Sequence, residues 1–174
     1  MESVKGPNSS NEETLARMVA QYEVTLLRTC YMYLHDRELA EDAAQETFLK
    51  AYKALNTFRG ESSEKTWLMR IAMNTCRDMR RNAWFRYVDR RVEIEPLPAP
   101  AEDADFMEAD ELAQAILRLP DRHKEVVLLH FYQDMTMREI ASVLNISAST
   151  VQKRVKAACS RLKRLLGKED YHES

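Results

Sequence analysis

Residues 136–163 read TMREIASVLNISASTVQKRVKAACSRLK. The segment opens with Thr136 and has Glu139 three residues later, which is the spacing of a helix capping box. Asn145 ends a short apolar pattern, and asparagine tolerates the left-handed backbone conformation that a tight turn requires. A longer amphipathic pattern follows it. The stretch therefore predicts a short helix, a tight turn and a second helix, which together form a helix-turn-helix.

The second of these helices is expected to have two chemically different faces, and Ser147 or Ser149 can cap its start. Its apolar stripe consists of Val151, Val155, Ala158, Leu162 and Leu165. The opposite side is polar and basic, with Ser149, Gln152, Lys153, Lys156, Ser160 and Lys163. A helix of this kind fits the major groove, where Gln and Lys side chains reach base edges. An amphipathic hairpin that only packs on its own module is the alternative.

The net charge of −2 conceals a segregation of charge along the chain. Residues 65–91 carry eight basic and two acidic side chains, residues 92–111 carry eight acidic and no basic ones, and residues 148–168 carry seven basic and no acidic ones. Two basic blocks separated by an acidic strip indicate two surfaces that face polyanions. Ordinary solvated helix faces are the alternative explanation.

Helical periodicity also organises the first half of the chain. One helix is expected from about residue 12 to 34, and a second from the N-cap Asp36 to about Leu55. Residues 56–64 contain Arg59-Gly60 and a serine pair, so they are expected to form a loop before a third helix over about 63–82. Few glycines and prolines interrupt these patterns.

The three prolines Pro96, Pro98 and Pro100 lie among acidic residues and predict a linker without regular structure. We therefore predict an all-α protein with two small helical domains joined by a flexible acidic linker, the second containing the helix-turn-helix. The expected boundaries are a disordered N-terminus (1–11), a first domain (12–90), the linker (91–108), a second domain (109–168) and a C-terminal tail (169–174).

The third helix of the first domain carries a row of basic side chains. Arg70, Asn74, Arg77 and Arg81 are spaced so that they lie within about 60° of one another around the helix. Such a row suits a nucleic-acid backbone. Phe58, Arg59 and Trp67 lie just before it and can hold an unstacked base. A core position for Trp67 is the alternative.

The second helix has an acidic outer surface. Its members are Glu38, Asp42, Gln45, Glu46, Leu49 and Lys53. A helix face that contacts only water does not require an exposed leucine. The leucine beside several carboxylates therefore predicts contact with a basic protein partner.

Other classes of function find little support in the residues. No stretch is apolar for long enough to span a bilayer, and residues 1–11 lack a signal-peptide pattern, so a cytoplasmic location is expected. The three cysteines have no metal-ligand spacing and are expected to be reduced thiols. The four histidines are scattered. We therefore predict no metal, no cofactor, no small-molecule substrate and no enzymatic activity.

Two long runs resemble a known family. DRELAEDAAQETFLKAYKALNTFRGESSEKTWLMRIAMNTCRDMRR at residues 36–81 resembles region 2 of extracytoplasmic-function (ECF) sigma factors of bacterial RNA polymerase. LPDRHKEVVLLHFYQDMTMREIASVLNISASTVQKRVKAACSRLK at residues 119–163 resembles their region 4. Many members of the family carry other residue types at the positions of Glu64, Lys156 and Ala157. The promoter sequence that such a member recognises therefore cannot be assigned to this protein.

The resemblance implies a role for each surface, in a protein that directs core polymerase to promoters and helps to open them. The residues implied at the −10 element are Phe58, Arg59, Trp67, Arg70, Asn74, Arg77, Arg80 and Arg81. Those implied at the −35 element are Ser149, Thr150, Gln152, Lys153, Arg154 and Lys156. Those implied on core polymerase are Asp42, Gln45, Glu46 and Leu49.

The partners that the resemblance implies are core RNA polymerase, promoter DNA and an anti-sigma factor. On the polymerase they are the clamp of the largest subunit and the flap of the second-largest. The anti-sigma factor is expected to be membrane-bound, and could hold the protein at the inner membrane face. Three alternatives stay open: a conventional helix-turn-helix regulator that binds duplex DNA alone, an enzyme acting on nucleic acid, and an adaptor that binds polymerase or a sigma factor without reading promoters.

Overall fold

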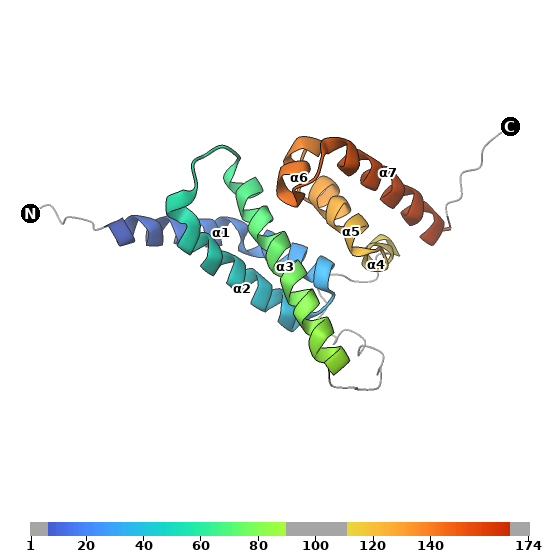
Figure 1. The fold of residues 1–174 in the computed structure, drawn as a ribbon, viewed down its shortest axis with the longest axis horizontal. Helices are drawn as coiled ribbons and strands as arrows, with labels where there is room; N and C mark the ends of the chain where they lie inside the picture. The colour runs from blue at the N-terminus through green and yellow to red at the C-terminus, as the bar shows by residue number, and fades with distance from the viewer. Residues whose placement is uncertain (1–6, 90–110, 168–174) are drawn as a thin grey trace, which may run out of the picture. The chain divides into compact units, whose positions relative to one another are not determined.

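The computed structural model describes residues 7–89 and 111–167, and all regular structure in these residues is helical. The chain divides into two compact units, which separate between Phe85 and Arg86. The prediction of an all-α protein is therefore confirmed (Figure 1). The expected acidic linker, 91–108, and the tail, 169–174, lie outside the described residues.

The first unit contains α1 (Pro7–Leu34), α2 (Arg37–Ala54), a 3-10 turn η1 (Leu55–Thr57) and most of α3 (Glu64–Asp89), which continues past the division between the units. The chain reverses between α1 and α2 because His35 adopts a positive φ of 51°. Asp36 then caps α2 as predicted, its carboxylate accepting a hydrogen bond from the Leu39 amide at 3.0 Å. In Figure 1, α3 crosses α1 and α2.

Alanines dominate the buried face of α2. Ala40, Ala43, Ala44 and Ala51 are buried there beside Phe48. Small side chains at these positions allow neighbouring helices to approach α2 closely. The other two helices contribute larger groups to the core: Met18, Leu26 and Cys30 from α1, and Leu68, Met69, Ala72, Met73 and Cys76 from α3.

Two helix ends differ from the expected ones. The helix α1 begins at Pro7, so the expectation of disorder over 1–11 is wrong for residues 7–11. Proline suits the first turn of a helix. The side-chain amide of Asn11 also donates a hydrogen bond to Asn56 Oδ1 at 3.0 Å. The helix α3 continues past the expected end at residue 82 to Asp89. Residues 82–89 contain no glycine or proline to stop it.

The second unit contains α4 (Glu111–Leu117), α5 (Asp121–Val127), a π-helical turn η2 (Leu128–Tyr132), α6 (Met137–Leu144) and α7 (Ala148–Leu165). The helix α7 packs on α4, α5 and α6. Their shared core includes Ile116, Val126, Leu129, Ile140, Val143 and Val151. The π-helical turn, unforeseen from the sequence, is a rare backbone form that is frequently found at functional sites.

Among the helices of residues 7–89 and 111–167, none is long and apolar enough to cross a membrane.

Candidate nucleic-acid interface

The helix-turn-helix forms through the local interactions that its sequence predicts. The Glu139 amide donates to Thr136 Oγ1 at 3.2 Å, and the Thr136 amide donates to Glu139 Oε2 at 2.7 Å, which completes the capping box. Asn145 has φ 54° and ψ 48°, the predicted left-handed turn. Of the two possible caps for α7, Ser147 is the one used; its Oγ accepts from the Thr150 amide at 3.1 Å.

The two faces of α7 separate as the periodicity indicates. Val151, Val155, Ala158 and Leu162 are buried, whereas Leu165 at the end of the stripe is 40% exposed. The polar residues Ser149, Gln152, Lys153, Lys156, Ser160 and Lys163 are exposed, and Thr150 and Arg154 are half-buried. The hydroxyls of Ser149 and Thr150 also contact Ser147 Oγ, at 3.1 and 2.8 Å. The side chains best presented to a partner are therefore Gln152 and the two lysines after it.

The imidazole of His123 on α5 is buried in the second unit. Its Nδ1 has no hydrogen-bond partner among the described residues. Burial lowers the pKa of His123, and the positive charges of Arg122, Arg161 and Arg154 lower it further. The neutral imidazole is thus the form that the folded unit favours.

This environment predicts a pH dependence for the stability of the second unit. The pKa of His123 in the folded unit is below its ordinary value. The neutral imidazole therefore stabilises the unit fully at pH values above the ordinary pKa, and this stabilisation is lost as the pH falls through the folded pKa. We expect the unfolding temperature of this unit to fall between about pH 8 and pH 5, and a His123→Leu variant to show a weaker dependence. Circular-dichroism melts at several pH values measure both. An identical dependence in the two proteins would contradict the prediction.

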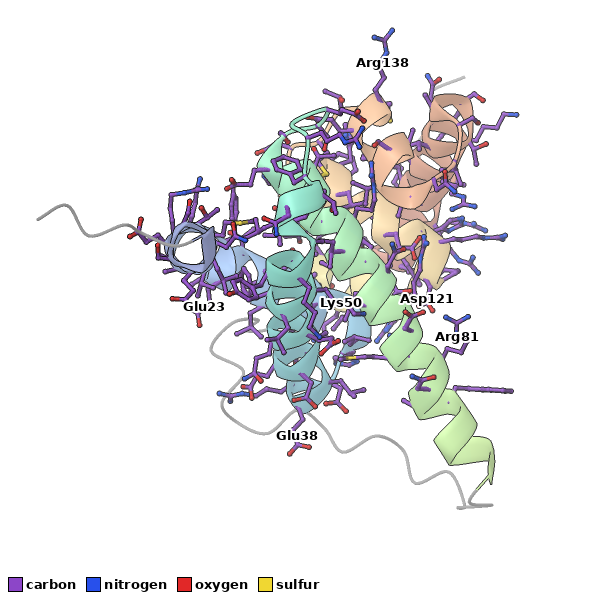
Figure 2. The ribbon with its side chains drawn as sticks, turned by 60° about the vertical axis from the view of Figure 1, so that its left-hand side comes forward. Glu23, Glu38, Lys50, Arg81, Asp121 and Arg138 are labelled. Atoms are coloured by element: carbon purple, nitrogen blue, oxygen red, sulfur yellow. The ribbon has the colours of Figure 1, made fainter. Side chains whose placement is uncertain are left out.

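The row of basic residues on α3 is exposed along one side of the helix. Asn74 and Arg81 are exposed, and Arg70 and Arg77 are half-buried. Figure 2 shows Arg81 projecting outward from α3. Its guanidinium also pairs with Asp78 one turn earlier on the same helix. This pairing reduces the net positive charge at that end of the row.

Arg80 is placed differently from its neighbours. Its Nη2 donates to the Tyr33 carbonyl oxygen at 2.5 Å, and its guanidinium carbon lies 5.0 Å from the centre of the Tyr33 ring. Tyr33 belongs to the last turn of α1, where carbonyl groups lack helical partners. Arg80 therefore joins α3 to the end of α1. The sequence offered no signal for this contact, because the two residues are 47 positions apart.

The aromatic cluster at the start of α3 forms as predicted. The rings of Phe58 and Trp67 have their centres 4.8 Å apart, and both side chains are half-buried. Arg59 beside them is exposed. Gly60 has a φ of 74°, so the loop turns at a residue without a Cβ. Each ring both packs within the unit and keeps an accessible surface.

Both ends of this loop are fastened to α1. At its start, Asn56 accepts the hydrogen bond from Asn11. At its end, Arg17 donates to the two carboxylate oxygens of Glu64 at 2.9 and 2.7 Å. The hydrogen bond from Arg17 is the main cause of a lowered pKa of Glu64. The carboxylate at this position thus serves as an anchor for the loop.

The outer face of α2 is acidic, as predicted. Glu38, Asp42, Gln45, Leu49 and Lys53 are exposed and Glu46 is half-buried; Leu49 is 53% exposed. Figure 2 shows Glu38 pointing away from the unit at the start of this helix. Lys50 lies on a different side, where its Nζ donates to Thr75 Oγ1 of α3 at 3.2 Å. The face therefore keeps its acidic character.

Comparison with known proteins assigns the family. The family model for sigma-70 region 2 matches residues 18–86, and the model for sigma-70 region 4 matches residues 109–162. This chain belongs to the sigma-70 family of RNA polymerase sigma factors. The region 2 match contains the aromatic cluster and the α3 row, and the region 4 match contains the helix-turn-helix.

Individual relatives place this sigma factor in the ECF group. It is 32% identical over 178 residues to the ECF RNA polymerase sigma factor SigM of Mycobacterium tuberculosis, covering 91% of this chain and 85% of that protein. It is 30% identical over 158 residues to the RNA polymerase sigma-H factor of Pseudomonas aeruginosa, covering 79% and 78%. ECF sigma factors direct transcription initiation at promoters, which is a DNA-binding function and not that of a classical enzyme.

Two solved structures share the fold. The sigma factor RpoE of Bartonella quintana, in complex with the anti-sigma factor NepR, has a TM-score of 0.76 at 21% identity, covering 91% of this chain and 99% of that one. CnrH, in complex with the cytosolic domain of CnrY, has a TM-score of 0.67 at 25% identity, covering 94% of both chains. Within the residues described for this sigma factor, no cluster of His, Cys, Asp or Glu could hold a metal ion.

Proposed function

We propose that this sigma factor reads the −10 element with the aromatic cluster and α3 of its first unit, and the −35 element with α7 of its second. The single observation that carries the proposal is that each unit exposes one basic surface built on a helix, α3 in one and α7 in the other. The proposed −10 contacts are Phe58, Arg59, Trp67, Arg70, Asn74, Arg77 and Arg81. We propose that Arg80 acts mainly by fixing α3 on α1. The domain limits given above remain predictions, apart from residues 7–11.

The energetics explain why strand opening is favoured. Unstacking a base costs a few kcal/mol. Stacking on Phe58 or Trp67 contributes about 1–3 kcal/mol of favourable free energy for each base. The guanidinium groups of the α3 row add charge-assisted hydrogen bonds to the single strand. Duplex DNA cannot make the stacking contacts, because its bases are already stacked. The unpaired strand is therefore the form that the first unit selects.

Core polymerase is the partner that we assign to the acidic face of α2. Carboxylates around an exposed leucine fit a basic surface with an apolar centre, and we propose the clamp of the largest subunit, contacted by Asp42, Gln45, Glu46 and Leu49. The second unit contacts the flap of the second-largest subunit. Since both units are then held on one polymerase, each DNA contact raises the effective concentration of the other.

An anti-sigma factor is the proposed regulator. The solved structure of RpoE from Bartonella quintana contains an anti-sigma factor, and it shares this fold. We propose that the regulator of this chain is membrane-bound and holds it at the inner membrane face until a signal releases it into the cytoplasm.

Run-off transcription with purified core polymerase across genomic fragments tests the proposed function and yields the promoter at the same time. Transcripts that depend on this protein and start at discrete sites are expected. Absence of transcription from every fragment would refute the proposal, and nanomolar binding to duplex DNA without polymerase would favour a conventional regulator.

Recognition of the −35 element predicts a second result. Gln152→Ala and Lys153→Ala should each weaken recognition about ten-fold, because one good base contact contributes about 1–3 kcal/mol. Core association should not change. Ser160→Ala, an exposed change on the same helix, is the matched control. Transcription from promoters with wild-type and scrambled −35 sequences gives the measurement, and an unchanged preference in both variants would rule out this face of α7.

A further inference from the structure

The loop before α3 is attached at both ends to one helix, α1. Asn56 at the start of the loop accepts a hydrogen bond from Asn11. Glu64 at its end accepts two from Arg17. Asn11 and Arg17 are six residues apart, a rise of about 9 Å along the axis of α1. The chain from Asn56 to Glu64 would span about 27 Å if fully extended. The two attachments therefore hold the loop in a compact form.

The contact between Arg17 and Glu64 is the stronger of the two. It is bidentate, since Nη1 and Nη2 of the guanidinium donate to Oε1 and Oε2 of the carboxylate at 2.9 and 2.7 Å. This geometry fixes the orientation of both groups as well as their distance. Two more residues of α1 join the contact: Gln21 Oε1 accepts from Arg17 Nη1 at 3.2 Å, and the Tyr22 hydroxyl hydrogen-bonds to Glu64. Such a network is stronger than an isolated surface ion pair.

The position of this network links it to the aromatic cluster. Glu64 is the first residue of α3, and Trp67 follows it by three residues. Residues with this spacing lie on the same side of a helix. The Trp67 ring packs against Phe58, which lies within the attached loop, with the ring centres 4.8 Å apart. The contact with Arg17 therefore fixes the part of the chain that carries both rings.

We propose that Arg17 and Glu64 are positioning residues for base capture, which hold the Phe58 and Trp67 rings in the arrangement that receives an unstacked base. The inference rests on the −10 role proposed for the aromatic cluster. Neither positioning residue contacts the DNA itself. A loop that is already ordered loses less conformational entropy when a base binds. The first unit therefore binds the base more tightly with this contact than without it.

The sign of one mutational effect distinguishes positioning from direct DNA binding by Arg17. If Arg17 bound a phosphate, Glu64→Gln would free its guanidinium and remove a negative charge, so the affinity for DNA would rise. Positioning predicts the opposite. Glu64→Gln and Arg17→Met should each lower the affinity of the holoenzyme for a promoter with a preformed bubble about five-fold, which corresponds to about 1 kcal/mol. The double variant should lose no more than the larger single loss, because both changes remove the same contact.

An abasic site placed at each position of the −10 element in turn locates the effect. In the wild-type holoenzyme, one abasic position should weaken binding more than the others, and it marks the captured base. Arg17→Met should cause little further loss on that template, because no base is left to capture, and should keep its five-fold effect on the others. Arg37→Met is the matched control, since it removes an arginine from another ion pair of the first unit, that of Arg37 with Glu41 on α2.

Three results would overturn the positioning role. They are a rise in affinity with Glu64→Gln, additive losses in the double variant, and an equal loss with Arg17→Met on every template, which is the effect of general destabilisation. A wild-type holoenzyme that binds all the abasic templates equally well would instead refute base capture by the first unit, and with it the proposed function.

Discussion

Replacing both Arg77 and Arg81 by alanine is expected to slow promoter opening about 100-fold, while the affinity for core polymerase stays within about two-fold. A hydrogen bond to a charged group contributes about 1.5–3 kcal/mol, so losing two such contacts removes about 3 kcal/mol, and each 1.4 kcal/mol is a factor of ten. Arg81 contributes less than Arg77, since Asp78 already pairs with it.

Permanganate reactivity of unpaired thymines measures opening, and competition with a labelled sigma factor measures core binding. Arg28→Ala with Arg118→Ala is the matched control, because it removes the same charge from exposed arginines outside the proposed DNA contacts. Equal loss of opening and core binding in the test variant would contradict the assignment of the α3 row to DNA.

Ile140→Ala is expected to unfold the second unit and leave the first one folded. Ile140 is completely buried beneath the helix-turn-helix. Its truncation costs about 2–5 kcal/mol, and a core of this size supplies about 3–5 kcal/mol in total. Recognition of the −35 element should be lost with the fold, whereas binding to a promoter with a preformed −10 bubble should survive.

Hydrogen exchange followed by mass spectrometry distinguishes the units. Amides within 111–165 should lose protection in Ile140→Ala, and amides within α1, α2 and α3 should keep it. Leu165→Ala removes a partly exposed leucine from the same unit and should change little. Simultaneous loss of protection in both units would show that they fold as one, against the two-domain prediction.

The features that could be predicted from the sequence are local ones. The capping box joins Thr136 to Glu139, the turn uses the backbone preference of Asn145 alone, and Asp36 caps the helix that follows it directly. Each involves residues within one turn of each other, so the necessary partners are adjacent in the sequence. The basic and acidic helix faces could be predicted for the same reason, since they depend only on helical periodicity.

The features that could not be predicted from the sequence are helix ends and side chains with distant partners. The periodicity ends α3 too early because its apolar stripe fades before the helix does. No signal in the sequence indicates that the Arg80 guanidinium donates to the Tyr33 carbonyl oxygen. Cys30 and Cys76 are separate thiols in the sequence, but the fold buries both and lets their side chains hydrogen-bond, which contributes to a raised pKa of Cys30.

By itself, then, the sequence determined the helices, their caps, the helix-turn-helix and the family, because short-range geometry and the pattern of charge are enough for these. Only the tertiary structure decided which charged groups hold the molecule together and which are presented to a partner. Arg17 with Glu64 and Arg80 with Tyr33 bring together residues 47 positions apart. Such pairs depend on how α1 and α3 pack, and no local pattern encodes that packing.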